Sequence, residues 1–249
     1  MLSRNVFAIR GAHKAALSAS KPTEKVTKLG SGLTVATIEK NGPLTQLVLA
    51  FKAGSRFEKA HQSGLAHTIR NFVGRDSKEY FGTSIVWSSS VAGGVFRAFT
   101  TRDLFGVALT VPRDQTSTGL SILGQAAAVP GFKPWEVEDV LSTMRADNGY
   151  RTQYDYVFDG IHKAAYRNGG LGNSIFSPCS KIGSVSAQSL TDFAEKHFVS
   201  GNGVLFATNA SHEELALYGE NFSPIRSGSV VTNPQSAYKL CFISLQTAV

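Results

Sequence analysis

The residues best placed to do chemistry are His67, Arg70 and Asn71, in the segment Gly-Leu-Ala-His-Thr-Ile-Arg-Asn that begins at Gly64. Their spacing is that of a His-x-x-Glu-His helix, whose two histidines bind zinc from one helical face while the glutamate polarises water. Here only the first histidine is present. Arg70 is permanently protonated and cannot act as a base, and Asn71 is a weak zinc ligand. The spacing predicts a zinc-hydrolase helix that has lost its chemistry.

No other group of residues replaces that chemistry. A zinc site needs three protein ligands, so a lone His67 is better explained as a packed or hydrogen-bonded residue. The two cysteines, Cys179 and Cys241, are not in a metal-binding cluster, and the chain contains no Gly-x-Ser-x-Gly elbow. We therefore expect no catalytic residue, metal or cofactor. The alternative is a surviving metalloprotease that uses His67, Asp147 and Glu138.

Composition points to a mitochondrial protein. The chain has 249 residues and a net charge of +7, and its first 23 residues carry Arg4, Arg10, Lys14 and Lys21 but no acid. That pattern is typical of a mitochondrial transit peptide, the alternative being a disordered basic N-terminus. Cleavage near residue 14 would remove three positive charges and leave +4, too little to indicate a nucleic-acid partner. No apolar run approaches the roughly 20 residues of a membrane span, so membrane association would go through partners.

The order of apolar patterns predicts an α+β fold, a mostly antiparallel sheet packed with helices, because most strands precede the helices. The pattern at 104–111 alternates and predicts a strand buried on at least one face. Strands are expected at 33–37, 45–53, 83–87, 95–100, 104–111 and 204–207, and helices at 64–72, 114–128, 135–145, 155–166, 186–198 and 211–220.

Several short motifs, in order, resemble the pitrilysin-type (M16) metallopeptidases. Residues 29–33 are similar to the family's opening L-x-N-G-L, residues 52–58 to its A-G-S-R-x-E, and residues 101–103 to its T-R-E. Residues 157–168 resemble its long helix, and 171–173, Pro178 and 182–183 follow in family order. The family includes mitochondrial processing peptidase subunits and the two core proteins of the cytochrome bc1 complex. Within it the resemblance is greatest to core protein 2.

This resemblance implies one of the family's two homologous domains, with a LuxS/MPP-like metallohydrolase fold. Residues 1–23 would be the transit peptide and leader, 24–228 the N-terminal domain, and 229–249 the start of a linker and a divergent tail. The chain would thus be truncated after its first domain. Active members supply a third zinc ligand from a later helix, and the alignment places Arg145 near that position. The vestigial motif positions are then His67, Arg70, Asn71 and Arg145.

The resemblance further implies an inactive peptidase homologue. Its role would be structural, as a core subunit of ubiquinol–cytochrome c reductase (respiratory complex III) on the matrix side of the inner membrane. Its partners would be core protein 1, cytochrome b and cytochrome c1. The alternative is the non-catalytic, substrate-recognising subunit of a mitochondrial processing peptidase. That subunit would carry a Gly-rich loop for which this sequence shows no convincing counterpart.

Overall fold

The structure, a computed structural model, describes residues 22–167 and 169–238. All but the end of the predicted leader, and residues 239–249 of the predicted tail, lie outside the described residues. The strands are β1 (Thr23–Lys28), β2 (Thr34–Glu39), β3 (Leu44–Phe51), β4 (Val95–Thr100), β5 (Phe105–Pro112) and β6 (Gly203–Thr208). The α-helices are α1 (Leu65–Asn71), α2 (Gly82–Val91), α3 (Thr116–Ala128), α4 (Pro134–Gly149), α5 (Gln153–Tyr166), α6 (Ala187–His197) and α7 (His212–Leu217).

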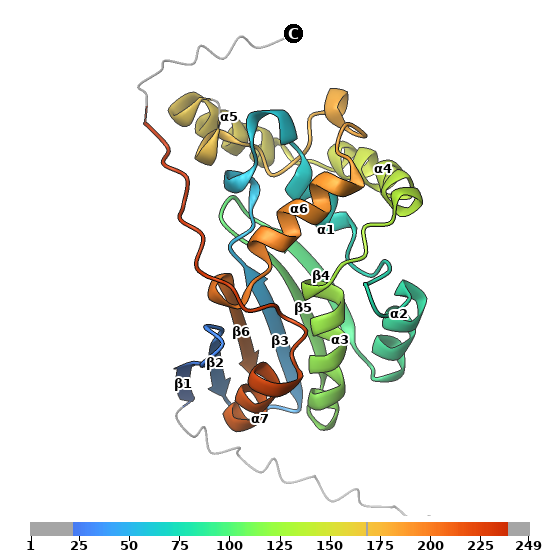
Figure 1. Cartoon of the computed structure of the whole chain (residues 1–249), viewed down its shortest axis with the longest axis vertical. Coiled ribbons are helices and arrows are strands. Elements are labelled where there is room, and N and C mark those ends of the chain that lie inside the picture. Colours follow the sequence, from blue (N-terminus) through green and yellow to red (C-terminus); the bar gives the residue numbers. More distant parts are fainter. Residues whose placement is uncertain (1–21, 168, 239–249) are drawn as a thin grey trace, which may run out of the picture.

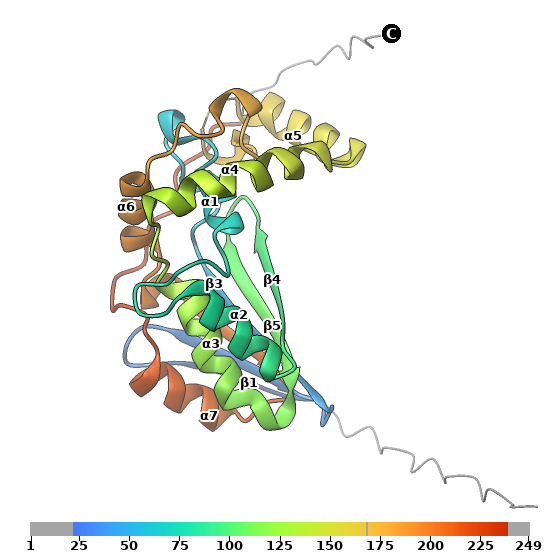
Figure 2. The same cartoon turned by 90° about the vertical axis from the view of Figure 1, so that its right-hand side faces the viewer.

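The six strands form one sheet in the order β1-β2-β6-β3-β5-β4. All neighbours are antiparallel except β2 and β6, which run parallel, so the predicted mostly antiparallel α+β fold is confirmed. Alternate residues of β3 are buried, which places one face of the sheet against α3 and leaves the other partly open. Helices α1, α4, α5 and α6 gather beyond one end of the sheet, where the candidate site lies (Figures 1 and 2).

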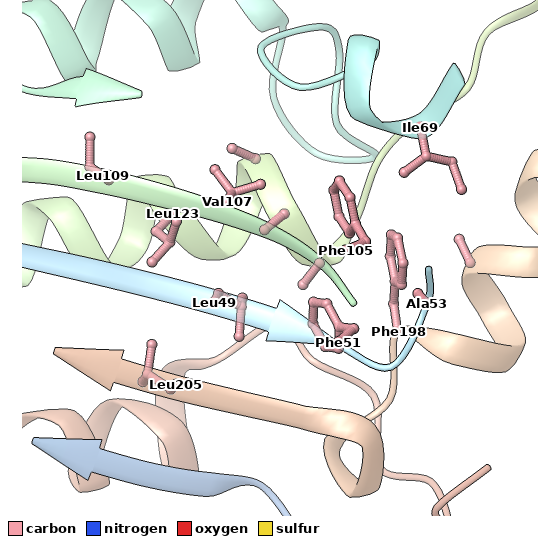
Figure 3. Close-up of a cluster of buried hydrophobic side chains, with 14 of the residues drawn as sticks. Leu49, Phe51, Ala53, Ile69, Phe105, Val107, Leu109, Leu123, Phe198 and Leu205 are labelled. Atoms are coloured by element: carbon pink, nitrogen blue, oxygen red, sulfur yellow. The ribbon is translucent and has the colours of Figure 1, made fainter. Parts of the chain in front are cut away.

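A cluster of aromatic rings joins the sheet to these helices. Phe198 stacks on Phe51 of β3 and on Phe105 of β5, with ring centroids 5.0 and 5.2 Å apart (Figure 3). Ile69 of α1 belongs to the same buried cluster, so the short helix is anchored in the core. Burying each such side chain is worth about 1.5–3 kcal/mol. The core therefore fixes where α1 stands relative to the strand ends.

Two local predictions need correction. The strand predicted at 83–87 is wrong, because these residues lie in α2. Ile85, Val86 and Trp87 have β-forming side chains, but the buried residues are Gly82, Ile85 and Ser89, spaced three and four positions apart as on one face of a helix, and α2 contacts α3. Strand β1 was not predicted because all six of its residues are exposed and leave no alternating apolar pattern.

After α7 the chain returns along the surface to the site end of the molecule. Along this path the Val231 N–H donates to the Asn202 side chain, the Pro234 carbonyl accepts from Arg56, and the Ser236 hydroxyl accepts from the Leu171 N–H. The division into a domain at 24–228 and a linker from 229 stays a prediction. Within the described residues, no helix is long and apolar enough to cross a bilayer.

Candidate functional site

The helix that carries His67 is held at its start by a buried carboxylate. Glu58 accepts hydrogen bonds from the N–H groups of Gly64 (3.0 Å) and Ala66 (2.7 Å), which otherwise lack partners at a helix start. Burial raises the pKa of Glu58 to about 7, although these backbone donors oppose the rise. Gly64 has a φ of 97°, and a side chain there would collide with Ser177. Glu58 and Gly64 therefore both fix the position of α1.

The ring of His67 is completely buried, and each of its nitrogens has a partner. Nδ1 accepts a hydrogen bond from the Ser177 N–H at 3.2 Å, and Nε2 lies 3.1 Å from Oδ2 of Asp147. A backbone N–H can only donate, so the ring proton belongs on Nε2 and is donated to Asp147. Phe176 covers the ring edge-on, with centroids 5.5 Å apart. The lone pair that a zinc ligand would offer is used inside the protein.

Asp147, on the last turn of α4, brings together the three motif positions of α1. Its Oδ2 accepts hydrogen bonds from His67, from the Arg70 guanidinium and, at 3.0 Å, from the Asn71 side chain. Asn71 also donates to the His67 carbonyl at 3.0 Å. The Arg70 side chain is only 19% exposed, so its positive charge is held against the carboxylate and away from water. The positive charge beside the Asp147 carboxylate is therefore that of Arg70.

Charge states follow from these contacts. Burial lowers the pKa of His67 to about 4, and the nearby Arg70 charge adds to this effect, whereas Asp147 opposes it. For Asp147, burial works against ionisation. The hydrogen bond from Asn71 and the charge of Arg70 outweigh it, so the pKa of Asp147 lies below its usual value. At neutral pH the site is a neutral histidine beside an Arg–Asp ion pair.

The residues predicted at this site divide into two groups. His67, Arg70 and Asn71 meet as expected, but Arg145 lies exposed on α4 and the residue of α4 that reaches them is Asp147. Glu138, the remaining member of the metalloprotease alternative, is exposed two turns earlier on α4. In the part of the chain that the structure describes, no group of three His, Cys, Asp or Glu residues could hold a metal ion.

A second ionic cluster lies next to this site and was not predicted. Asp159 of α5 pairs with Arg102 at 2.6 Å and with Arg151 at 2.5 Å, and it accepts a hydrogen bond from Ser174. The Arg151 guanidinium stacks 4.5 Å from the centre of the Phe176 ring. Because Phe176 also covers His67, the two clusters share one wall.

The family-like motifs at 52–58 and 101–103 meet at this end of the sheet. Gly54 lies so close to Arg102 that a side chain would come within 2.3 Å of its carbonyl oxygen. Arg56 and Asp103 form an ion pair at 2.9 Å. Arg102 in turn reaches α5 through Asp159. The motifs that carry the resemblance thus fix the loops around the site.

Two hollows open on either side of the Arg151–Phe176 stack. One, of about 420 Å³, is lined by Arg70, Asn71 and Asp147 together with Ala98 of edge strand β4. The other, of about 550 Å³, lies against α5 and the loop that follows it.

Comparison with known proteins agrees with this arrangement. The family model of the insulinases, peptidase family M16, matches residues 34–179, which include the His67 helix and Asp147. The chain belongs to peptidase family M16. A crystal structure of a protease from Helicobacter pylori superposes with a TM-score of 0.76 over 88% of this chain and 54% of that one. At 16% identity that likeness shows the fold alone.

Among curated relatives, cytochrome b-c1 complex subunit 2 of Homo sapiens is 28% identical over 86% of this M16 chain and 47% of its own length. The Rattus norvegicus protein of the same name is 27% identical with the same coverage. The mitochondrial-processing peptidase subunit beta of Dictyostelium discoideum is 26% identical over 84% of this chain and 46% of its own length. These relatives are mitochondrial by name. The chain spans about half the length of the curated relatives it matches.

The position of Asp147 could have been predicted from the helical spacing of apolar residues in α4. Val137, Val140, Met144 and Asp147 follow each other at intervals of three, four and three, and the first three are buried, so Asp147 continues the inward face of α4. Arg145 falls on the other face. Nothing in the spacing points to Asp159, because its partners Arg102 and Arg151 lie in separate segments.

Proposed function

We propose that this chain is a non-catalytic subunit of the mitochondrial ubiquinol–cytochrome c reductase, of the core protein 2 type. The observation that carries the proposal is the Arg70–Asp147 pair. Arg70 stands where an inverted zinc peptidase has its general base, and its charge neutralises the carboxylate that faces His67. The likeness to cytochrome b-c1 complex subunit 2 in three mammals supports the choice of complex.

On this proposal the role of the chain is structural. Core protein 1 would be its immediate partner, and cytochrome b and cytochrome c1 would belong to the same assembly on the matrix side of the inner membrane. The basic leader at 1–23 would direct import. The domain at 24–228 would supply the contact surfaces, and residues from 229 would begin the connection toward a second domain.

A role as the substrate-recognising subunit of a processing peptidase has less support, because of the sign of the charge beside the site. Presequences are arginine-rich and acid-poor, so they are repelled by cations. The two hollows are lined by more basic than acidic side chains: Arg70, Arg151, Lys163, Arg167 and Lys181 against Asp147, Asp155 and Asp159.

The test is isolation of the tagged 249-residue chain from mitochondria by native electrophoresis, with mass spectrometry of the band. The proposal expects cytochrome b and cytochrome c1 in that band. A parallel measurement titrates the purified chain with a fluorescent arginine-rich presequence peptide. Migration free of respiratory subunits, together with saturable presequence binding, would contradict the proposal and favour the processing peptidase.

A further inference from the structure

The 550 Å³ pocket beside α5 is separate from the His67 site. Its wall is formed by α5, by the loop that follows this helix, and by Arg151 and Lys181. The stacked Arg151 and Phe176 side chains separate it from the hollow that contains Asp147. Nothing in the proposed structural role uses this pocket.

Positive charge exceeds negative charge around the pocket. Its one carboxylate, Asp159, is occupied by Arg102, Arg151 and the Ser174 hydroxyl. Lys163 and Arg167 also line the pocket, and among the described residues neither lies within ion-pair distance of a carboxylate. Lys181 adds a further positive charge. The local electrostatic potential therefore favours an anion.

Lys163 lies in the last turn of α5, and Arg167, four positions later, is the residue that follows the helix. Like charges four positions apart repel each other, and the partial negative charge of the helix C-terminus offsets a similar amount. Helix stability alone therefore gives little reason for the pair. A bound carboxylate between these cations would turn their repulsion into attraction.

The pocket is kept open by the backbone around it. Gly160 lies in the middle of α5 and lines the pocket, and a side chain added there would meet open space. A glycine inside a helix is less stable than an alanine at the same position. Gly172 packs so closely that a side chain would lie 2.1 Å from the Arg167 carbonyl oxygen. The tight turn thus holds Arg167 at the rim while Gly160 leaves room behind it.

We propose that this pocket binds a carboxylate-rich segment of a protein partner. The arginine and lysine side chains that line the pocket match several carboxylates better than a single small anion, because they come from different segments of its wall. The volume is that of a site for several side chains, and the charged lining differs from the apolar walls of pockets for drug-like molecules. The inference does not depend on which mitochondrial complex contains the chain.

The experiment is fluorescence anisotropy of the full chain with a short fluorescein-labelled peptide of alternating glutamate and alanine. Lys163→Glu/Arg167→Glu should weaken binding by about tenfold or more, since two attractive contacts become repulsive. The matched control is Lys25→Glu/Lys40→Glu, with the same change in net charge on β1 and next to β2, at the opposite end of the molecule (Figure 1). It should change the affinity by no more than about twofold.

Filling the pocket without changing charge gives an independent readout. Gly160→Leu should weaken peptide binding, whereas Gly160→Ala should leave it nearly unchanged, because a single methyl group takes up little of the space. Equal weakening by both charge-reversed double variants would overturn the inference, since attraction would then follow net charge alone. Displacement of the peptide by equimolar inorganic phosphate would also overturn it, by showing a phosphate site.

Discussion

The molecule places arginines in two neighbouring sites with opposite outcomes. At the His67 site one cation, Arg70, faces one carboxylate, Asp147, and the charges cancel. Beside α5 one carboxylate, Asp159, faces two arginines, and neither Lys163 nor Arg167, which also line the pocket, lies within ion-pair distance of a carboxylate among the described residues. In the first site the charge of Arg70 balances the charge of Asp147. In the second the imbalance leaves charge for a ligand.

The comparison teaches that a cation near the His67 site can have either of two roles. A balanced, half-buried pair locks two helices together, because separating either partner leaves a charge that water reaches poorly. A cluster with more cations than carboxylates leaves a net positive potential at the protein surface. Substitutions that remove the two carboxylates should therefore affect stability by different amounts, and the first two predictions measure that difference.

The largest effect is expected from Asp159→Ala. Arg102 and Arg151 have side chains only 10% and 14% exposed and would both lose their carboxylate, so the free energy of unfolding should fall by about 3–5 kcal/mol. Urea denaturation measures the change. Asp192→Ala, at an exposed position of α6, is the control and should cost less than about 0.5 kcal/mol. A smaller loss for Asp159→Ala than for Asp147→Ala would reverse the ranking of the two clusters.

Asp147→Ala should have the next largest effect and lower the free energy of unfolding by about 1–3 kcal/mol. The Asp147 side chain is 31% exposed, so water replaces part of the lost pairing. A double-mutant cycle sharpens the point. Arg70→Met/Asp147→Ala should lose less stability than the sum of Arg70→Met and Asp147→Ala, because the double variant leaves neither charge without its partner. Additive losses would show that Arg70 and Asp147 do not act as a pair.

The free energy of unfolding should also depend on pH through the protonation of His67. The folded-state pKa of His67, about 4, lies below the unfolded value of 6.5, so the unfolded chain takes up the proton more readily. The contribution is present above pH 6.5 and is lost as pH falls toward 4. Between pH 7 and pH 5 the wild type should lose about 1–2 kcal/mol relative to His67→Gln. Parallel pH profiles for the two proteins would contradict the buried neutral histidine.

Glu58 acts in the opposite direction over part of this range. Its folded-state pKa, about 7, is above the usual value of 4.5, so its contribution is present below pH 4.5 and is lost as pH rises through 7. The His67→Gln comparison must therefore be made in a background that keeps Glu58. His197, whose pKa burial also lowers to about 4, is unchanged in both proteins and cancels.

Gly160→Ala should produce the smallest effect and the opposite sign. The added methyl group meets no atom within 4 Å, and alanine favours the helix, so stability should rise by about 0.5–1 kcal/mol. Thermal denaturation gives the direction. A loss of stability would mean that the pocket is not open at this position, and it would weaken the contrast between the two sites.

The sequence predicted what depends on short spacings. The α1 frame, the pair Arg70 and Asn71, and most strand positions follow from local patterns, and the fold class was confirmed. Helix α2 was predicted as a strand because the β preferences of Ile85, Val86 and Trp87 are local, whereas the packing of α2 against α3 is not. At these residues, packing within the fold outweighs the intrinsic preference for a strand.

The partners of the site residues required three-dimensional information. The family pattern placed Arg145 near His67. The residue of α4 that reaches His67 is instead Asp147, two positions later, on the inward face of the helix. Arg102 and Asp159 are 57 positions apart in the sequence. No local rule pairs them, because the contact is set by where the turn between β4 and β5 reaches α5.

The most direct test of the account measures zinc in the purified 249-residue chain by mass spectrometry, alongside hydrolysis of a fluorogenic peptide. Arg70→Glu/Asn71→His, which rebuilds the His-x-x-Glu-His pattern next to Asp147, serves as the reference for metal uptake. The account predicts no stoichiometric zinc and no chelator-sensitive hydrolysis in the natural chain, and zinc uptake by the variant. Stoichiometric zinc in the natural chain, with hydrolysis abolished by a chelator, would contradict it.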